Sequence, residues 1–167
     1  MEWQYCPVCG DALDGTVVEG RERRYCPSCD HVYWRNPKPV AWLLAQHGDR
    51  YLLVKRAHPP DTGTWDIPGG FLEHGESFPA AAAREFEEEC GVPADSDALD
   101  LHTTLSFGRA DENVVGAVFH AELEDAVDPV PGDEVSDAQW WRLDQLTASD
   151  ETVRDVCIPV FEEEKDR

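Results

Sequence analysis

The sequence has few lysines, a single methionine and no long run of apolar residues. Only Lys38, Lys55 and Lys165 are lysines among 14 basic residues, which face 35 acidic ones. The resulting formal net charge of −21 repels nucleic acid and anionic membrane surfaces, so we expect neither as a partner. No stretch approaches the roughly 18 apolar residues that a membrane span needs.

A secretory signal is also missing at the N-terminus, where MEWQYCPVCG has no basic region followed by an apolar segment. We therefore expect a cytoplasmic protein. The excess of acids over lysines resembles proteins of salt-loving organisms, and an ordinary acidic bacterial protein is the alternative. The length of 167 residues predicts one domain of ordinary size plus a small appendage. The hydrophobic content of 41% is near the globular average, which allows a real core. The sequence carries no signal of oligomeric state.

Four of the six cysteines form two Cys-x-x-Cys pairs near the N-terminus. This spacing predicts a tetrahedral zinc site with the ligands Cys6, Cys9, Cys26 and Cys29. Residues 1–35 would then be a small zinc ribbon whose stability comes largely from the metal. Two disulfides are the alternative, which a cytoplasmic setting disfavours. His31 is a further candidate ligand, although four thiolates already satisfy zinc.

The Pro-rich segment at residues 35–39 marks a domain boundary, and residues 38–160 are expected to form the main domain. Residues 161–167 are expected to be a frayed tail. Apolar patterning predicts the secondary structure of the main domain. The expected strands are 39–47, 51–57, 101–107, 114–123 and 138–143, with a turn at 109–113, a loop at 127–133 and a short helix from residue 144.

One helix is predicted over residues 77–91, with Ser77 as the N-cap and Gly91 as the left-handed C-terminal residue. Glu85, Glu88 and Glu89 fall on one face of this helix. Their mutual repulsion, close to the negative end of the helix dipole, destabilises the helix. Close carboxylates of this kind bind a hard divalent cation well, so we interpret the face as a metal site. Residues 82, 86 and 90 form the neighbouring apolar stripe, which places Cys90 in the core.

The segment GFLEHGESFPAAAAREFEEECGV, residues 70–92, resembles the signature of the Nudix hydrolases at every fixed position. The order of ribbon, Pro-rich link and signature resembles the subgroup with an N-terminal zinc ribbon. The resemblance implies an α/β fold, an α/β/α sandwich with a mixed central sheet. It also implies hydrolysis of a nucleoside diphosphate linked to another group.

The resemblance further assigns roles to residues of the signature. Mg²⁺ or Mn²⁺ would be bound by the carboxylates of Glu76, Glu85, Glu88 and Glu89 and by the carbonyl of Gly70. Arg84 would orient the carboxylates. The general base is either Glu85 or a loop residue, Glu134, with its neighbour Asp133 as a further candidate.

The substrate is sought outside the signature. The motif SQPWPFPxS of NADH-cleaving relatives is absent, and Gly108 stands where ADP-ribose hydrolases often have proline. We expect a substrate of the ADP-ribose, NADH or FAD type. The expected contacts are Lys55, Arg56, Trp65 and Phe107, with Trp65 also interpreted as a packing residue. The alternatives are a non-catalytic nucleotide sensor and an RNA-cap hydrolase.

Overall fold

The computed structural model describes residues 3–109 and 112–165. The chain divides into two compact units. The first comprises residues 1–37 together with 108–113, and the second comprises residues 38–107 and 114–167. The boundary after Pro37 lies at the Pro-rich link.

The small unit contains a three-stranded antiparallel sheet whose strands follow one another in order. Its strands are β1 (Asp14–Val18), β2 (Arg21–Cys26) and β3 (His31–Tyr33). The buried core consists of Cys6, Leu13 and Cys26, with Cys29 and Tyr33 packed against it. So few apolar side chains bury too little surface to stabilise the fold without a crosslink or a metal.

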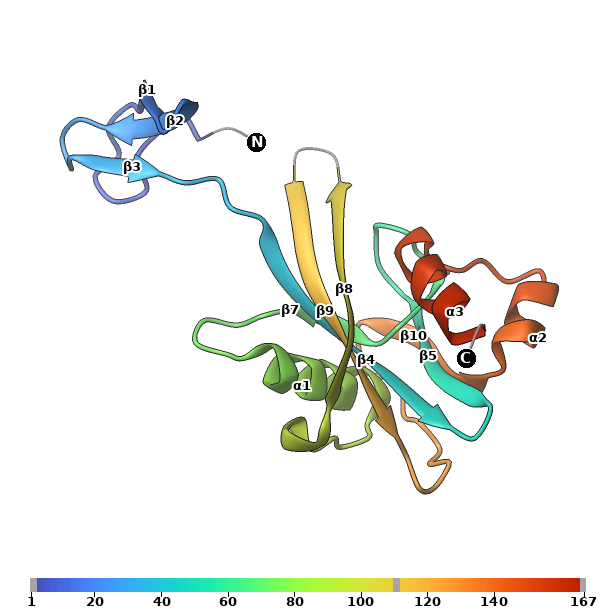
Figure 1. Cartoon of the computed structure of the whole chain (residues 1–167). Coiled ribbons are helices and arrows are strands. Elements are labelled where there is room, and N and C mark those ends of the chain that lie inside the picture. The colour runs from blue at the N-terminus through green and yellow to red at the C-terminus, as the bar shows by residue number, and fades with distance from the viewer. Residues whose placement is uncertain (1–2, 110–111, 166–167) are drawn as a thin grey trace. The chain divides into compact units, whose positions relative to one another are not determined.

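The large unit is built on a mixed seven-stranded sheet in which five strands follow the order β10-β5-β4-β9-β8 (Figure 1). Strands β4 and β9 run parallel, whereas β5 runs antiparallel to both β4 and β10. The short strands β6 and β7 extend the sheet beside β5 and β4. The strands are β4 (Lys38–His47), β5 (Arg50–Arg56), β6 (Trp65–Asp66), β7 (Gly69–Phe71), β8 (Asp100–Arg109), β9 (Glu112–Glu122) and β10 (Val135–Trp141).

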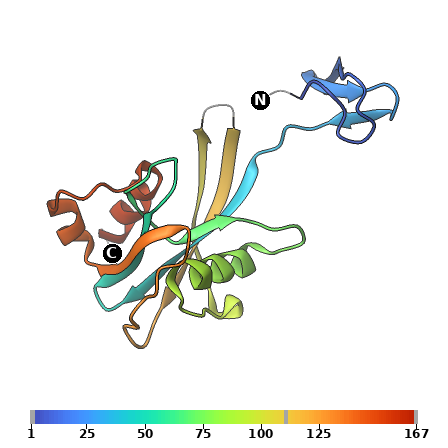
Figure 2. The same ribbon diagram turned by 180° about the vertical axis from the view of Figure 1, so that it is seen from behind.

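Helices cover both faces of this sheet, as Figures 1 and 2 show. The helix α1 packs on one face through Ala81, Ala82, Phe86 and Cys90. On the other face, Val160 and Phe161 of α3 and Leu146 of α2 join a second core. This is the expected α/β/α arrangement. The helical segments are α1 (Phe78–Cys90), α2 (Leu143–Ala148) and α3 (Ile158–Lys165), with short 3₁₀ turns at Ser96–Ala98 and Asp155–Cys157.

The ends of α1 follow from local sequence. The hydroxyl of Ser77 accepts a hydrogen bond from the amide of Ala80, and proline occupies the first turn. Gly91 ends the helix with φ of 68°, and its amide donates to the carbonyl of Glu87. The predicted boundaries of this helix are confirmed.

Other elements differ from the predictions. Strand β10 begins at Val135, three residues before its predicted start, and α2 begins at Leu143. The segment expected to fray is helical as far as Lys165, because Phe161 is buried and the Tyr51 hydroxyl donates to Glu164. The turn predicted at 109–113 lies partly outside the described residues. None of the described helices is long and apolar enough to cross a membrane.

Candidate active site and cysteine cluster

Arg84 is the centre of a network on the solvent side of α1. Its guanidinium donates two hydrogen bonds to Glu76, at 2.9 and 3.0 Å, and one to Glu85 at 2.9 Å. It also donates to Glu88 at 3.1 Å and to the carbonyl of Phe71 at 3.0 Å. The hydrogen bonds from Arg84 lower the pKa of Glu76. One cation therefore holds three of the predicted metal ligands in place.

Glu89 lies on the inner side of the same face and is only 9% exposed. One carboxylate oxygen accepts a hydrogen bond of 2.9 Å from the amide of Gly69. Burial raises the pKa of Glu89 to about 8, although the Gly69 amide and the charge of Arg56 act in the opposite direction. With this pKa, the Glu89 carboxyl is mostly protonated at neutral pH unless a cation compensates its charge.

Gly70 allows the strand β7 to approach α1 closely. A Cβ at this position would lie 2.4 Å from the carboxylate of Glu85, so a larger residue would have to displace that side chain. Burial raises the pKa of Glu85, while the hydrogen bond from Arg84 lowers it. The β7 backbone thus lies close to Glu85 and Glu89 of α1.

A loop joining β9 to β10 brings two further acids to this face. Asp133 and Glu134 line a cavity of about 260 Å³ together with Glu85, Glu88 and Glu89. Five carboxylates and no basic residue line this cavity, which is the donor set that hard divalent cations prefer. The carboxylate donor set of the cavity is chemically suited to such an ion.

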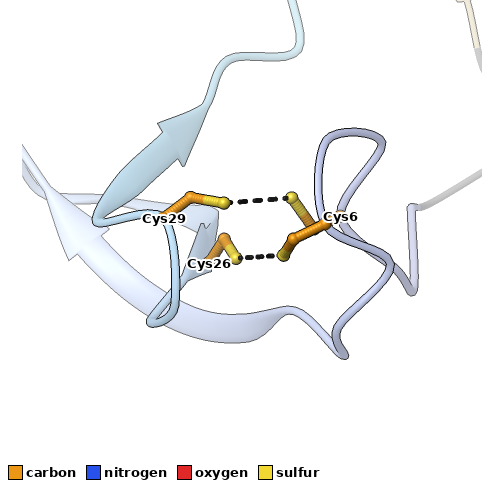
Figure 3. A group of neighbouring side chains, drawn as sticks. Cys6, Cys26 and Cys29 are labelled. Carbon is orange, nitrogen blue, oxygen red and sulfur yellow. Dashed lines mark hydrogen bonds between the residues drawn. The ribbon is translucent and has the colours of Figure 1, made fainter.

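The four N-terminal cysteines form the second cluster (Figure 3). Their sulfur atoms all lie within 4.8 Å of one another, with 3.9 Å between Cys6 and Cys29 and 3.5 Å between Cys9 and Cys26. Tetrahedral zinc–sulfur bonds of about 2.3 Å place thiolates at similar separations. A hydrogen bond with the Tyr33 hydroxyl lowers the pKa of Cys6 to about 6, which favours the ligating thiolate. His31 contacts the ring of Tyr33 edge-on and is not part of the cluster.

The residues expected to contact substrate mostly have protein partners. Trp65 is 1% exposed, packs edge-on against Trp141 and donates to Glu151, so it is a packing residue and cannot stack on a nucleotide base. This corrects the substrate role given to it. Lys55 pairs with Glu151 at 2.8 Å.

Arg56 and Phe107 lie in a similar setting. Arg56 donates to the carbonyl of Pro60 and lies 3.5 Å from Asp66. Phe107 packs against the core beneath the guanidinium of Arg154. For Lys55, Arg56 and Phe107, substrate contact stays a prediction.

Sequence reasoning missed the buried carboxylate of Asp66, which is 3% exposed. It accepts hydrogen bonds from Arg154 at 2.7 Å and from the thiol of Cys157 at 2.9 Å. This network ties the segment after α2 to β6, three residues before Gly69. An aspartate inside an apolar strand was the only signal in the sequence, and its partners lie about 90 residues away along the chain.

Comparisons with known proteins agree with this geometry. Residues 35–161 match the sequence profile described as the NUDIX domain. The NAD-capped RNA hydrolase NudC of Stutzerimonas stutzeri is 30% identical over 149 residues, which are 87% of this chain and 50% of that protein. NudC of Pseudomonas aeruginosa is 30% identical over 146 residues. The chain thus spans about half the length of the curated relatives it matches.

Solved structures give the same fold. A NUDIX hydrolase from Nitrosomonas europaea has a TM-score of 0.80 at 26% identity, over 99% of this chain and 92% of that one. The NUDIX domain of Shewanella oneidensis NrtR, solved with ADP ribose, has a TM-score of 0.66 at 20% identity. That match covers 86% of this chain and 94% of that one, and at this identity it shows the fold alone.

Proposed function

The chain belongs to the Nudix hydrolase family, and we propose that it cleaves the pyrophosphate bond of a nucleoside diphosphate linked to a second group, such as ADP-ribose, NADH or FAD. The observation that carries this proposal is the cavity lined by five carboxylates. All three glutamates of the predicted helix face, Glu85, Glu88 and Glu89, line it. A pyrophosphate is itself anionic, so binding beside these carboxylates requires divalent cations between the two.

Mg²⁺ or Mn²⁺ would be held by carboxylates of α1, by Glu76 in the segment just before it, and by the β7 backbone. The proposed ligands are Gly70, Glu76, Glu85, Glu88 and Glu89. When bound, such an ion neutralises phosphate charge and lowers the pKa of a coordinated water. Arg84 orients Glu76, Glu85 and Glu88 for this task and is not itself a ligand.

The chemical step needs a base that takes a proton from the attacking water. As the water oxygen bonds to phosphorus, the bond from phosphorus to the bridging oxygen breaks, and the second phosphate leaves with that oxygen. We assign the base to Glu134 or Glu85, both of which line the cavity. Burial raises the pKa of Glu85, which makes its carboxylate more basic, whereas Glu134 is exposed and can reach a water on the open side.

The cysteine cluster has a separate role in the proposal. It holds a structural Zn²⁺ through Cys6, Cys9, Cys26 and Cys29, because four thiolates leave no open coordination position for catalysis.

The substrate is identified by incubating the protein and Mg²⁺ with ADP-ribose, NADH, FAD, dinucleoside polyphosphates and nucleoside triphosphates, at low and at molar salt. Chromatography separates the products. Release of AMP from one of the first three compounds supports the proposal. Tight binding of a nucleotide without product, in either salt, would instead favour a nucleotide sensor.

A second candidate is the removal of an NAD cap from RNA, because the curated relatives carry that name. The net charge of −21 opposes binding of the RNA chain. Adding a short NAD-capped RNA to the panel separates the two candidates. If the RNA is cleaved far more efficiently than free NADH and the rate falls steeply with salt, removal of the NAD cap from RNA replaces cleavage of a free nucleotide derivative as the proposed function.

A further inference from the structure

The loop that carries Asp133 and Glu134, residues 127–134, is bound directly to the last turn of α1. The amide of Val130 donates to the carbonyl of Cys90 at 2.8 Å, and the amide of Gly132 donates to the carbonyl of Glu89 at 3.1 Å. On its other side, the carbonyl of Glu134 accepts from the amide of Ala57 at 3.2 Å. The loop therefore bridges α1 and Ala57, the residue that follows strand β5.

These hydrogen bonds satisfy carbonyl groups at the C-terminal end of α1. The last carbonyls of a helix have no partners within it, and they concentrate negative charge where Glu88 and Glu89 already add theirs. The amides of Gly91, Val130 and Gly132 donate to carbonyls of this last turn, those of Glu87, Cys90 and Glu89. The loop thus replaces water as the partner of the helix end and acquires a defined position relative to the glutamates.

The contact is so close that only glycine fits at position 132. A Cβ built there would lie 2.0 Å from the carbonyl oxygen of Glu88 and 3.1 Å from its carbonyl carbon. Both are backbone atoms, which cannot rotate away as a side chain would. By contrast, a Cβ at Gly15 would meet no atom within 4 Å. A side chain at position 132 must therefore separate the loop from the helix.

The loop is the partner that would move. On its inner side α1 is anchored by Phe86 and Cys90, both fully buried against the sheet, and Glu89 is held by Gly69. The side chains of Asp133 and Glu134 are exposed, so they are not packed into the core as Phe86 and Cys90 are. Displacement of the loop would carry their carboxylates away from those of α1.

We propose that Gly132 is a positioning residue, which sets the distance between the carboxylates of the loop and the metal-binding face of α1. The inference rests on the proposed function, and specifically on a base in this loop. Gly132 touches neither substrate nor metal; it acts through Glu134 or Asp133. A displacement of about 1 Å in such a group can lower a rate by up to about 100-fold.

The test is a double-mutant cycle on the substrate that the panel identifies. Gly132→Ala should lower kcat by about 10- to 100-fold and leave KM and the Mg²⁺ requirement unchanged, because the binding groups of α1 stay in place. Gly132→Ala combined with Glu134→Gln should be no slower than Glu134→Gln alone, since the displaced base is already absent. The same masking by Asp133→Asn would also support the proposal. Gly15→Ala is the matched control, expected to have the wild-type kcat.

Two results would overturn the proposal: a wild-type kcat in Gly132→Ala, or losses that multiply in both double variants. If Gly132→Ala does not fold, Pro131→Gly loosens the same loop without a clash and should lower kcat several-fold with the same masking. A crystal structure of either folded variant would show the position of the loop without the need for an activity assay. A loop that still donates from residue 132 to Glu89 in Gly132→Ala would refute the inference even if no substrate is found, whereas an inactive wild type would refute only the proposed function.

Discussion

Glu89→Gln should make the metal-free protein more stable while abolishing its activity. The pKa of Glu89 is raised from 4.5 to about 8 by burial, so the native state retains a proton that the unfolded chain releases above pH 4.5. The stability linked to this proton is fully present below pH 4.5 and is lost as the pH rises toward 8. Glutamine resembles the protonated acid and can keep the hydrogen bond from Gly69. The stability of the Glu89→Gln protein therefore does not fall in this way as the pH rises.

The size of the effect follows from the pKa difference. In the unfolded chain Glu89 has a pKa of 4.5, which is 2.5 units below pH 7. At 1.36 kcal/mol per unit, deprotonation of this carboxyl favours the unfolded state by about 3 kcal/mol. We therefore expect the unfolding free energy of Glu89→Gln, in the presence of a chelator, to exceed that of the wild type by up to about 3 kcal/mol at pH 7. The difference should shrink toward zero near pH 4.5.

The assay is urea unfolding followed by circular dichroism, with chelator and at several pH values. Glu87→Gln is the matched control: Glu87 is exposed on the same helix, and its replacement should change stability by less than about 0.5 kcal/mol. Saturating Mg²⁺ should stabilise the wild type and remove the advantage of the variant. A Glu89→Gln protein that is less stable than the wild type at pH 7 to 8 without metal would refute the reasoning.

Four further predictions concern the base, the zinc cluster, the charge and the core. Glu134→Gln should lower kcat by about 100-fold or more if Glu134 is the base, and Glu85→Gln should then act mainly on the Mg²⁺ requirement; steady-state rates against Mg²⁺ concentration separate the two assignments. Cys26→Ser should abolish tight binding of one zinc ion per chain, measured by metal analysis after dialysis, whereas Cys157→Ser should not. Raising salt from low to molar concentration should raise the melting temperature, because screening reduces the repulsion of a chain with net charge −21; an unchanged or lower value would contradict the resemblance to proteins of salt-loving organisms. Phe86→Ala should cost about 3–5 kcal/mol of unfolding free energy, because Phe86 is fully buried between α1 and the sheet; a loss under about 1 kcal/mol would show that this core is not closely packed.

The family and the α/β/α fold were predictable because their signals are local in sequence. Ser77 and Gly91 delimit α1, and the spacing of three glutamates places them on one face whatever the rest of the chain does. The match of residues 35–161 to the NUDIX domain confirms the family predicted from the signature. The clustering of the cysteines agrees with a spacing that is equally local.

The remaining features depend on contacts between distant segments. Trp65 has an aromatic ring that could stack on a nucleotide base, and only the packing of β6 beside Trp141 shows that this ring is buried. Residues 161–165 have weak helical signals and many charges, and α3 forms because Val160 and Phe161 bury themselves on the sheet. The docking of Gly132 on Glu89 joins residues 43 positions apart, and no periodicity in the sequence marks it.

The most direct test of the account compares wild type and Glu88→Gln at equal Mg²⁺, with ADP-ribose, NADH and FAD in water labelled with the heavy oxygen isotope. Glu88 lines the acidic cavity and is mostly exposed, so its replacement should leave the fold intact. We predict AMP release by the wild type, heavy oxygen in a phosphate of one product, and a rate at least about 100-fold lower in Glu88→Gln. Equal rates in the two proteins, or turnover that persists in a chelator, would contradict hydrolysis at these carboxylates.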